Sequence, residues 1–148
     1  MNNDYQTWLH KIGKKECDLH GIQGFKNSYQ LHEGMSLSAV WPNDVVMEMN
    51  DEHRGSTLLV DSLFNISSLL VLSARVKRYC ESQELLCTEF LPVQIKDHNG
   101  SILDEEYFIL NVTELVDCLD IDASEAEESM MTDDIDSVNG IVLKQTEL

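Results

Sequence analysis

The sequence predicts an α+β domain in which a mixed or mainly antiparallel sheet carries few helices. Short runs of β-branched, aromatic and other apolar residues recur through the middle of the chain. A helix start signal stands at Ser73. Two strand-forming runs flank a strong turn signal and predict a hairpin at residues 88–112. Sheet segments in mixed order with few helices are typical of the α+β class.

Length, composition and charge limit what kind of protein this is. A chain of 148 residues suits a single domain over 1–148, and a hydrophobic fraction of 43% suits a packed core. The 27 acidic and 10 basic residues give a formal charge of −17, which repels nucleic acid and anionic lipid and attracts basic proteins. No run has the pattern of a signal peptide or of a membrane span, so we expect a cytoplasmic location.

The first half of the chain favours few regular elements. We expect a loop-rich arm over residues 1–34, with a short helix near Tyr5–Ile12. Pro42 restricts Trp41 to an extended or turn conformation. The following DVVMEM, residues 44–49, favours a short strand, and the polar NDEHRG after it favours a turn.

A helix is expected behind Ser73, because its hydroxyl can cap the free amides of a first turn. Val76, Tyr79 and Cys80 then fall on one face, which we expect to be the buried one. The other face carries the basic residues, Arg75, Lys77 and Arg78. A single helix from about Ile66 to about Glu81 is the alternative.

The predicted hairpin turns at Asn99-Gly100, because both residues tolerate the positive φ of a two-residue turn. We expect Phe90 and Ile109, one from each strand, to share one core. Pro92 has no N–H to donate, so its strand lies at an edge or is bulged there. Residues 114–120, ELVDCLD, favour one more short strand.

Motifs for catalysis and for metal binding are incomplete. GMSLS at residues 34–38 lacks the second glycine of a nucleophile elbow. Cys17 and His20 have the spacing of metal ligands, but no second tight pair completes a tetrahedral set. We therefore expect no catalytic residue, no cofactor and no metal. An uncharacterised enzyme or small-ligand-binding protein that uses the histidines and cysteine of the N-terminal arm stays as an alternative.

Residues 117–134, DCLDIDASEAEESMMTDD, hold many carboxylates and no Lys or Arg. A calcium loop beginning at Asp120 fails, because Glu125 stands where glycine is needed and Met131 where a bidentate glutamate is needed. The acidic segment, taken as 120–137, is then a solvated surface, a flexible segment, a helix starting at Asp122 or Ser124, or a surface for a basic partner.

A partner-binding role singles out an acidic set and one aromatic residue. The acidic candidates are Asp120, Asp122, Glu125, Glu127, Glu128, Asp133, Asp134 and Asp136. Trp41 is the candidate apolar anchor, although a tryptophan beside a proline is more often part of a core edge.

Four segments occur in an order that resembles a known family: WPNDVVMEM, LLVDSLFNISSLLVLSARVKRYCE, EFLPVQIKDHNG and EYFILNVTELVDCLD, within residues 41–122. The motifs that carry the resemblance are Trp41-Pro42 with Asp44, Asp61-Ser62, the helix led by Ser73, Leu91-Pro92-Val93, the Asp97–Gly100 turn, and Tyr107-Phe108-Ile109 leading to Val116-Asp117. They resemble the Imm11, or DUF1629, type of immunity proteins of bacterial polymorphic toxin systems.

The resemblance implies a protein that neutralises a cognate toxin by direct protein–protein contact and that has no catalytic residues. The charge of −17 adds the expectation of a basic toxin domain as the partner, with neither nucleic acid nor membrane bound. An adaptor of a secretion apparatus is a further alternative.

Overall fold

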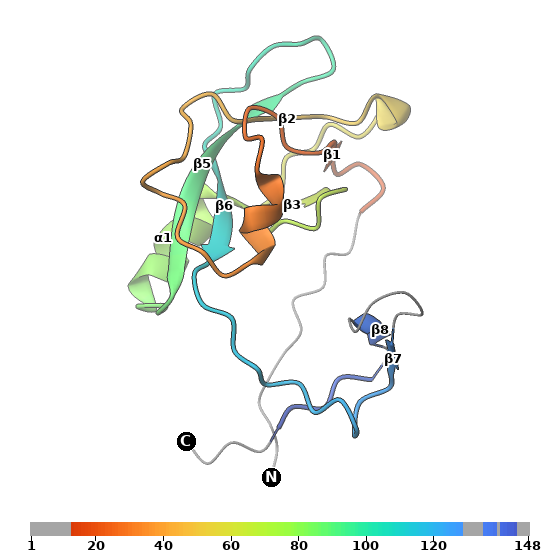
Figure 1. Ribbon diagram of the computed structural model, residues 1–148. Coiled ribbons are helices and arrows are strands. Elements are labelled where there is room, and N and C mark those ends of the chain that lie inside the picture. The colour runs from red at the N-terminus through yellow and green to blue at the C-terminus, as the bar shows by residue number, and fades with distance from the viewer. Residues whose placement is uncertain (1–12, 129–134, 139, 145–148) are drawn as a thin grey trace. The chain divides into compact units, whose positions relative to one another are not determined.

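The computed structural model describes residues 13–128, 135–138 and 140–144 (Figure 1). The chain divides into two compact units, residues 1–114 and 115–148. The helix predicted near residues 5–12 and the candidate residues Asp133 and Asp134 lie outside the described residues. The prediction of a single domain over the whole chain stays a prediction.

The first unit is built on a six-stranded mixed sheet in the order β1-β3-β4-β6-β5-β2. Its strands are β1 (Asp18–Leu19), β2 (Val46–Glu48), β3 (Ser62–Asn65), β4 (Val71–Ser73), β5 (Thr88–Lys96) and β6 (Tyr107–Val112). The β3-β4, β4-β6 and β6-β5 pairs are antiparallel, whereas β1 runs parallel to β3 and β2 parallel to β5. This confirms the predicted α+β class, the hairpin over residues 88–112 and the strand within 44–49.

The sheet curls until its two edge strands meet, so that it nearly forms a barrel (Figure 1). The His20 N–H donates to the Glu48 carbonyl at 2.8 Å, and the Asn50 N–H donates to the Asp18 carbonyl at 2.9 Å. Gln23 and Val46 exchange a further pair of backbone hydrogen bonds. These contacts use backbone groups that a sheet edge would otherwise leave unpaired. Part of the predicted loop-rich arm is therefore built into the barrel.

Alternate residues of β5 and β6 point into the barrel and form its core. Leu91 pairs directly with Ile109, and both are buried. Phe90 pairs with Leu110, one residue along, and these two side chains lie on the outer face. The prediction that Phe90 and Ile109 share one core is therefore wrong, because successive residues of a strand face opposite sides.

The turn between β5 and β6 lies where the sequence predicts it, but its geometry differs. The Gly100 N–H donates to the Asp97 carbonyl at 3.0 Å, and the Asp97 N–H donates to the Ser101 carbonyl at 2.9 Å. Gly100 has a φ of +84°, whereas Asn99 is not among the positive-φ residues. The loop is thus a three-residue turn with glycine in the left-handed position, not a two-residue turn.

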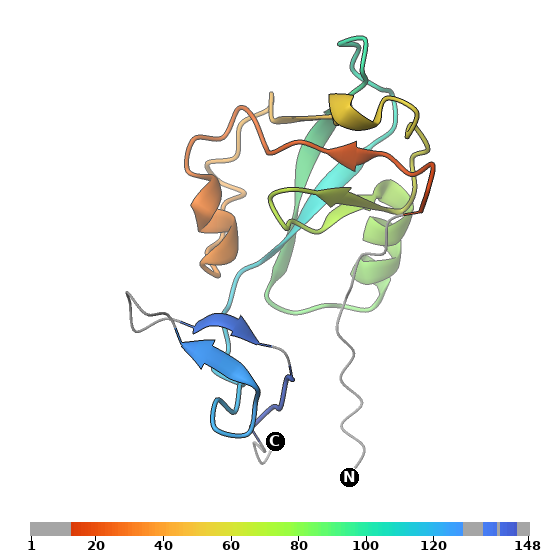
Figure 2. The ribbon, with the colours of Figure 1, turned by 90° about the vertical axis from the view of Figure 1, so that its right-hand side faces the viewer.

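Helix α1 (Ala74–Ser82) follows β4 directly and lies on the outer side of the sheet, against β4 and β6 (Figure 2). The Ser73 hydroxyl accepts a hydrogen bond from the Val76 N–H at 3.4 Å, which confirms the predicted cap. Because β4 occupies residues 71–73, the alternative of one longer helix is wrong. No helix in the described part of the chain is long and apolar enough to cross a bilayer.

The buried face of α1 differs from the predicted one. Cys80 is buried and the Lys77 ammonium lies 4.7 Å from the centre of the Phe108 ring, whereas Tyr79 is 66% exposed. Tyr79 is turned about 100° from Cys80 around the helix axis, while Lys77 is one turn from it. The lysine stem therefore covers the sheet where the tyrosine was expected.

Two 3₁₀ helices complete the first unit, η1 (Ser28–His32) and η2 (Asp51–His53). The second unit contains the antiparallel pair β7 (Ala126–Glu128) and β8 (Ile135–Val138) and an isolated bridge between Leu119 and Leu143. Residues 121–125 form turns, so the helix expected near Asp122 is absent from these residues. The strand expected over residues 114–120 is reduced to the single bridge at Leu119.

Candidate partner-binding surfaces

Trp41, the candidate apolar anchor, is held against the first unit's own core. Its indole N–H donates to the Pro92 carbonyl at 2.8 Å, and its ring lies 4.8 Å from the Phe25 ring, centre to centre. The pairing of β2 with β5 begins only at Gln94, so Pro92 has a strand neighbour on one side alone. This geometry supports the core-edge explanation, and the anchoring role of Trp41 stays a prediction.

The acidic candidates that lie within the described residues of the second unit fall on a turn and on the β7-β8 pair. Asp120 is half-buried and accepts a hydrogen bond from the Ala123 N–H at 3.1 Å, so it organises the turn. Asp122, Glu125 and Glu127 are exposed. Glu128 lies in β7 and Asp136 in β8. The contact of these residues with a partner stays a prediction.

Several residues that carry the family resemblance make contacts within the first unit. Asp61 accepts a hydrogen bond from the Ser73 hydroxyl at 2.6 Å and forms an ion pair with Arg75, which ties the start of α1 to the segment before β3. The Tyr107 hydroxyl donates to the Val60 carbonyl at 2.8 Å. The Asp97 carboxylate accepts from two amides of its own turn. These residues hold the scaffold together.

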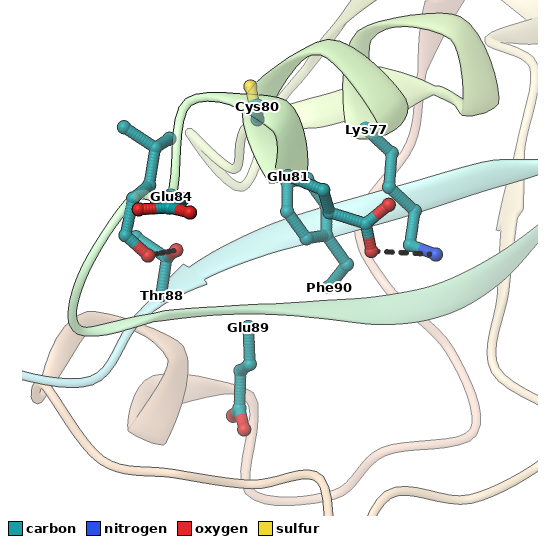
Figure 3. Close-up of a pocket in the computed structure, with 8 residues that line it drawn as sticks. Lys77, Cys80, Glu81, Glu84, Thr88, Glu89 and Phe90 are labelled. Atoms are coloured by element: carbon teal, nitrogen blue, oxygen red, sulfur yellow. Dashed lines mark hydrogen bonds and ion pairs between the residues drawn. The ribbon is translucent and has the colours of Figure 1, made fainter.

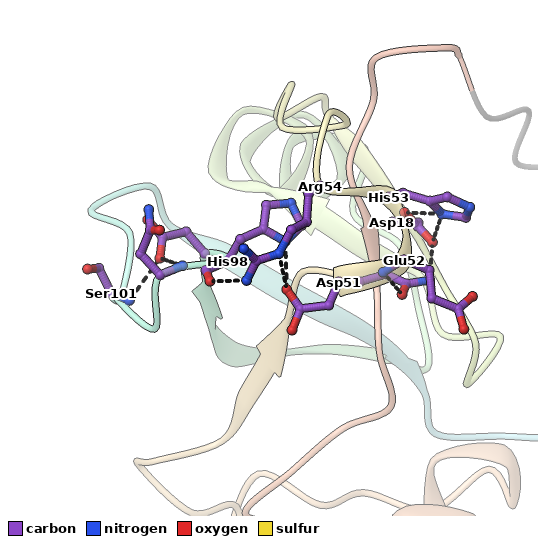
Figure 4. Close-up of polar contacts among 10 residues, drawn as sticks. Asp18, Asp51, Glu52, His53, Arg54, His98 and Ser101 are labelled. Atoms are coloured by element: carbon purple, nitrogen blue, oxygen red, sulfur yellow. Dashed lines mark hydrogen bonds and ion pairs between the residues drawn. The ribbon is translucent and has the colours of Figure 1, made fainter.

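A buried carboxylate stabilises the junction between β1 and η2 (Figure 4). The Asp18 side chain is 8% exposed, accepts a hydrogen bond from the Asn50 amide at 2.8 Å, and lies 3.0 Å from His53 Nδ1. Burial alone raises the pKa of Asp18, but the hydrogen bonds from Asn50 and His53 outweigh it and hold that pKa below its usual value. Asp18 is therefore an ionised structural group at neutral pH.

The same end of the barrel carries a second polar cluster, which joins η2 to the hairpin turn (Figure 4). The Asp51 carboxylate accepts from Arg54 Nε at 3.0 Å, and Arg54 Nη2 donates to the His98 carbonyl at 3.1 Å. The His98 side chain is 9% exposed, and its Nδ1 lies 3.4 Å from Asp51 Oδ1. These contacts connect η2 and the residue after it to the hairpin turn. None of them places a nucleophilic side chain beside a general base.

Cys17, the one cysteine of the N-terminal arm, is not a reactive thiol. Cys17 is 1% exposed, and burial raises its pKa to about 11, with a further contribution from the charge of Asp18. The thiol is therefore protonated and inert at neutral pH. Within residues 13–128, 135–138 and 140–144, no three His, Cys, Asp or Glu side chains gather as metal ligands.

GMSLS, the segment tested as a nucleophile elbow, wraps around a carboxylate instead. Glu89 accepts hydrogen bonds from the Leu37 N–H at 2.6 Å, the Ser36 hydroxyl at 2.9 Å and the Asn111 amide at 2.7 Å. Burial alone raises the pKa of Glu89, but these donors outweigh it and lower that pKa. Ser36 therefore helps to hold its loop against Glu89 of β5.

An exposed apolar surface that the sequence patterns do not indicate lies at the end of α1. We call it the α1-end surface and define it by Glu84, Leu85, Leu86 and Phe90. Leu86 is 86% exposed and Leu85 47%. Leu85 also lines a cavity of about 420 Å³, together with Phe90 and other residues of α1, of β5 and of the segment between them.

The close-up of this cavity shows how its charged groups are arranged (Figure 3). Glu81 and Glu84 stand on the same side as Phe90, whereas Glu89 points away, toward the loop that it anchors. Lys77 pairs with Glu81 at 3.2 Å. The signal in the sequence is the apolar pair Leu85-Leu86, separated from the end of α1 by two residues, and such a pair is equally typical of a core.

Comparison with known families identifies the family of this chain. The model of the immunity protein family (Imm11) matches residues 13–143, which is most of the chain. A search of the curated proteins finds no significant match. The matched range contains all six strands of the barrel, α1 and every motif on which the resemblance depends. The chain therefore belongs to the Imm11 immunity protein family, as its sequence motifs predict.

Proposed function

We propose that this protein neutralises a cognate bacterial toxin by direct protein–protein contact, in the cytoplasm of the cell that makes both. The observation that carries the proposal is the match of the immunity family over residues 13–143. Neutralisation would then be stoichiometric: one surface of the protein covers the toxin's active site or holds the toxin inactive.

The chemistry of the described residues supports binding rather than catalysis. The buried or half-buried carboxylates Asp18, Asp61 and Glu89 each accept hydrogen bonds that hold one segment of the first unit to another. Cys17 is buried and protonated, and the exposed Cys87 thiol donates to the Glu114 carboxylate, which raises the pKa of Cys87. These groups are committed to the scaffold, and exposed surface remains as the means of action.

The charge of the chain supports a basic partner. A formal charge of −17 gives a long-range attraction toward a cationic domain and speeds encounter. Toxins that act on nucleic acid need basic surfaces to bind phosphates, and such a surface is complementary to this protein. The proposed partner is therefore a basic toxin domain.

The test is co-expression with the toxin domain encoded beside this gene. We expect cells that make the toxin alone to stop growing and cells that make both proteins to grow. The purified proteins should also elute together in size-exclusion chromatography and bind in calorimetry. A toxin from an unrelated system serves as the control for specificity. Growth arrest in the presence of this protein, together with no detectable complex, contradicts the proposal.

A further inference from the structure

We propose that the α1-end surface is where the cognate toxin docks, through a basic segment that places one apolar side chain in the cavity beside Phe90. This inference rests on the proposed function, and it names a surface and the chemistry of the segment that fits it. Three features of the described residues support it: exposed apolar side chains, a backbone that holds them outward, and a helix end that carries carboxylates and has no basic residue in its last turn.

The first feature is the amount of apolar surface in one place. Leu86 is more exposed than any other large hydrophobic residue of the described chain, and Leu85, 47% exposed, is its neighbour in the chain. The Thr113 N–H donates to the Cys87 carbonyl at 2.8 Å, which brings the 43% exposed Val112 beside this segment. Clustered exposed apolar side chains next to a cavity are typical of protein-binding sites.

The second feature is the backbone on both sides of Leu85-Leu86. Glu84 has a φ of +51° and Cys87 a φ of +54°, a conformation that residues with a side chain rarely adopt. These two residues bend the chain so that the leucines stand outside the fold, between the end of α1 and the start of β5. Hydrogen bonds from the Gln83 N–H to the Cys80 carbonyl and from the Thr88 hydroxyl to the Leu85 carbonyl keep the turn in place.

The third feature is charge. The last turn of α1 has no basic residue, although the partial negative charge of a helix C-terminus favours one. Glu81 and Glu84 add two carboxylates there, and Lys77 pairs with only the first of them (Figure 3). A lysine or arginine of the partner would complement both the helix end and Glu84. A cationic segment with an apolar side chain therefore fits this surface better than an acidic or purely apolar one.

The experiment measures the dissociation constant for the toxin domain with two test variants and two matched controls. Leu86→Ala removes the most exposed leucine, and Ile66→Ala is its control, since Ile66 is 65% exposed and lies between β3 and β4. Glu84→Lys reverses one charge at the helix end, and Glu52→Lys makes the same change at an exposed residue of η2. Thermal unfolding of all four variants checks that the fold is kept.

We expect Leu86→Ala and Glu84→Lys each to raise the dissociation constant by about tenfold or more, as a residue central to an interface does, and the controls by less than about threefold. Equal binding by the test variants and the wild type overturns the surface assignment while the proposed function stands. Equal weakening by test and control variants overturns it as well. If Leu86→Ala changes only the oligomeric state, a second copy covers the surface and the inference is wrong. Failure of the wild-type protein to bind the toxin is distinguishable from all of these, because it contradicts the proposed function itself.

Discussion

The indole N–H of Trp41 donates a hydrogen bond to the carbonyl oxygen of Pro92, 2.8 Å away and 51 residues along the chain. It joins two of the family motifs at the point where β5 has no neighbour on the β2 side. Proline leaves the strand without an amide there, and the tryptophan satisfies the carbonyl that remains.

Replacing Trp41 should therefore affect stability. We expect Trp41→Phe to lower the free energy of unfolding by about 1 kcal/mol, because the ring stays and the hydrogen bond is lost. Trp41→Ala should cost about 2 kcal/mol or more, because contacts with Phe25 and the core are lost as well. Denaturation in guanidinium chloride measures both. An unchanged stability of Trp41→Phe, together with weaker toxin binding, favours the anchor role instead.

The hairpin turn should be sensitive at Gly100 and much less so at Asn99. Gly100 has a φ of +84°, so Gly100→Ala should lower the free energy of unfolding by about 1–2 kcal/mol. A Cβ there meets only the Lys96 side chain, at 3.6 Å, so the cost is conformational and not steric. Asn99→Val is the control and should cost less. Thermal melts compare the two, and a larger loss for Asn99→Val contradicts this turn geometry.

The Asp18 cluster predicts a specific loss of stability in acid. Since the pKa of Asp18 is lowered in the folded state, its contribution is present above the unfolded-state value of about 3.9 and is lost as the pH falls through the folded-state value. At pH 7 we expect Asp18→Asn to cost about 1–3 kcal/mol, and the difference from wild type should shrink below pH 4. Urea denaturation of both proteins at several pH values measures this difference in the free energy of unfolding. The exposed Asp104→Asn serves as the control, and a difference that grows toward acid pH contradicts the role of Asp18.

The end of α1 should become more stable when its left-handed residue is glycine. Glu84 follows the helix cap with a φ of +51°, where glycine carries no steric penalty. We expect Glu84→Gly to raise the free energy of unfolding by up to about 1 kcal/mol. Glu84→Gln keeps the strained backbone and should leave stability nearly unchanged. Chemical denaturation of the two variants and the wild type compares their free energies of unfolding. A Glu84→Gly variant that is less stable than the wild type contradicts this prediction.

The acidic segment should affect how fast the toxin is captured more than how tightly it is held. Exposed charges act over about 8 Å at physiological salt, and each pair contributes only about 0–1 kcal/mol. We expect neutralisation of Glu125, Glu127, Glu128, Asp133 and Asp134 to lower the association rate and flatten its salt dependence, with little change in dissociation. Stopped-flow binding at low and high salt measures this. Association as fast as wild type at low salt shows that the segment is only a solvated surface.

Local chemistry determined the parts of this protein that the sequence predicts correctly. The Ser73 hydroxyl and the amides it can cap are close neighbours in the chain, as are Asp97 and Gly100 in their turn. Their geometry is set within a few residues, so the start of α1 and the position of the hairpin can be read directly. The order of the family motifs is likewise a property of the sequence, and it identifies the family without any contact being known.

Long-range packing decided the rest. Whether Phe90 or Leu91 faces the core depends on register against β6, since a shift of one residue exchanges the two faces of a strand. The meeting of β1 with β2 and the exposure of Leu86 depend on segments distant in sequence, and an apolar pair has the same pattern whether it is covered or not. The sequence alone therefore determined the fold class and the family. Only the tertiary structure could distinguish a leucine of the core from one available to a partner, because burial is a property of neighbours in space.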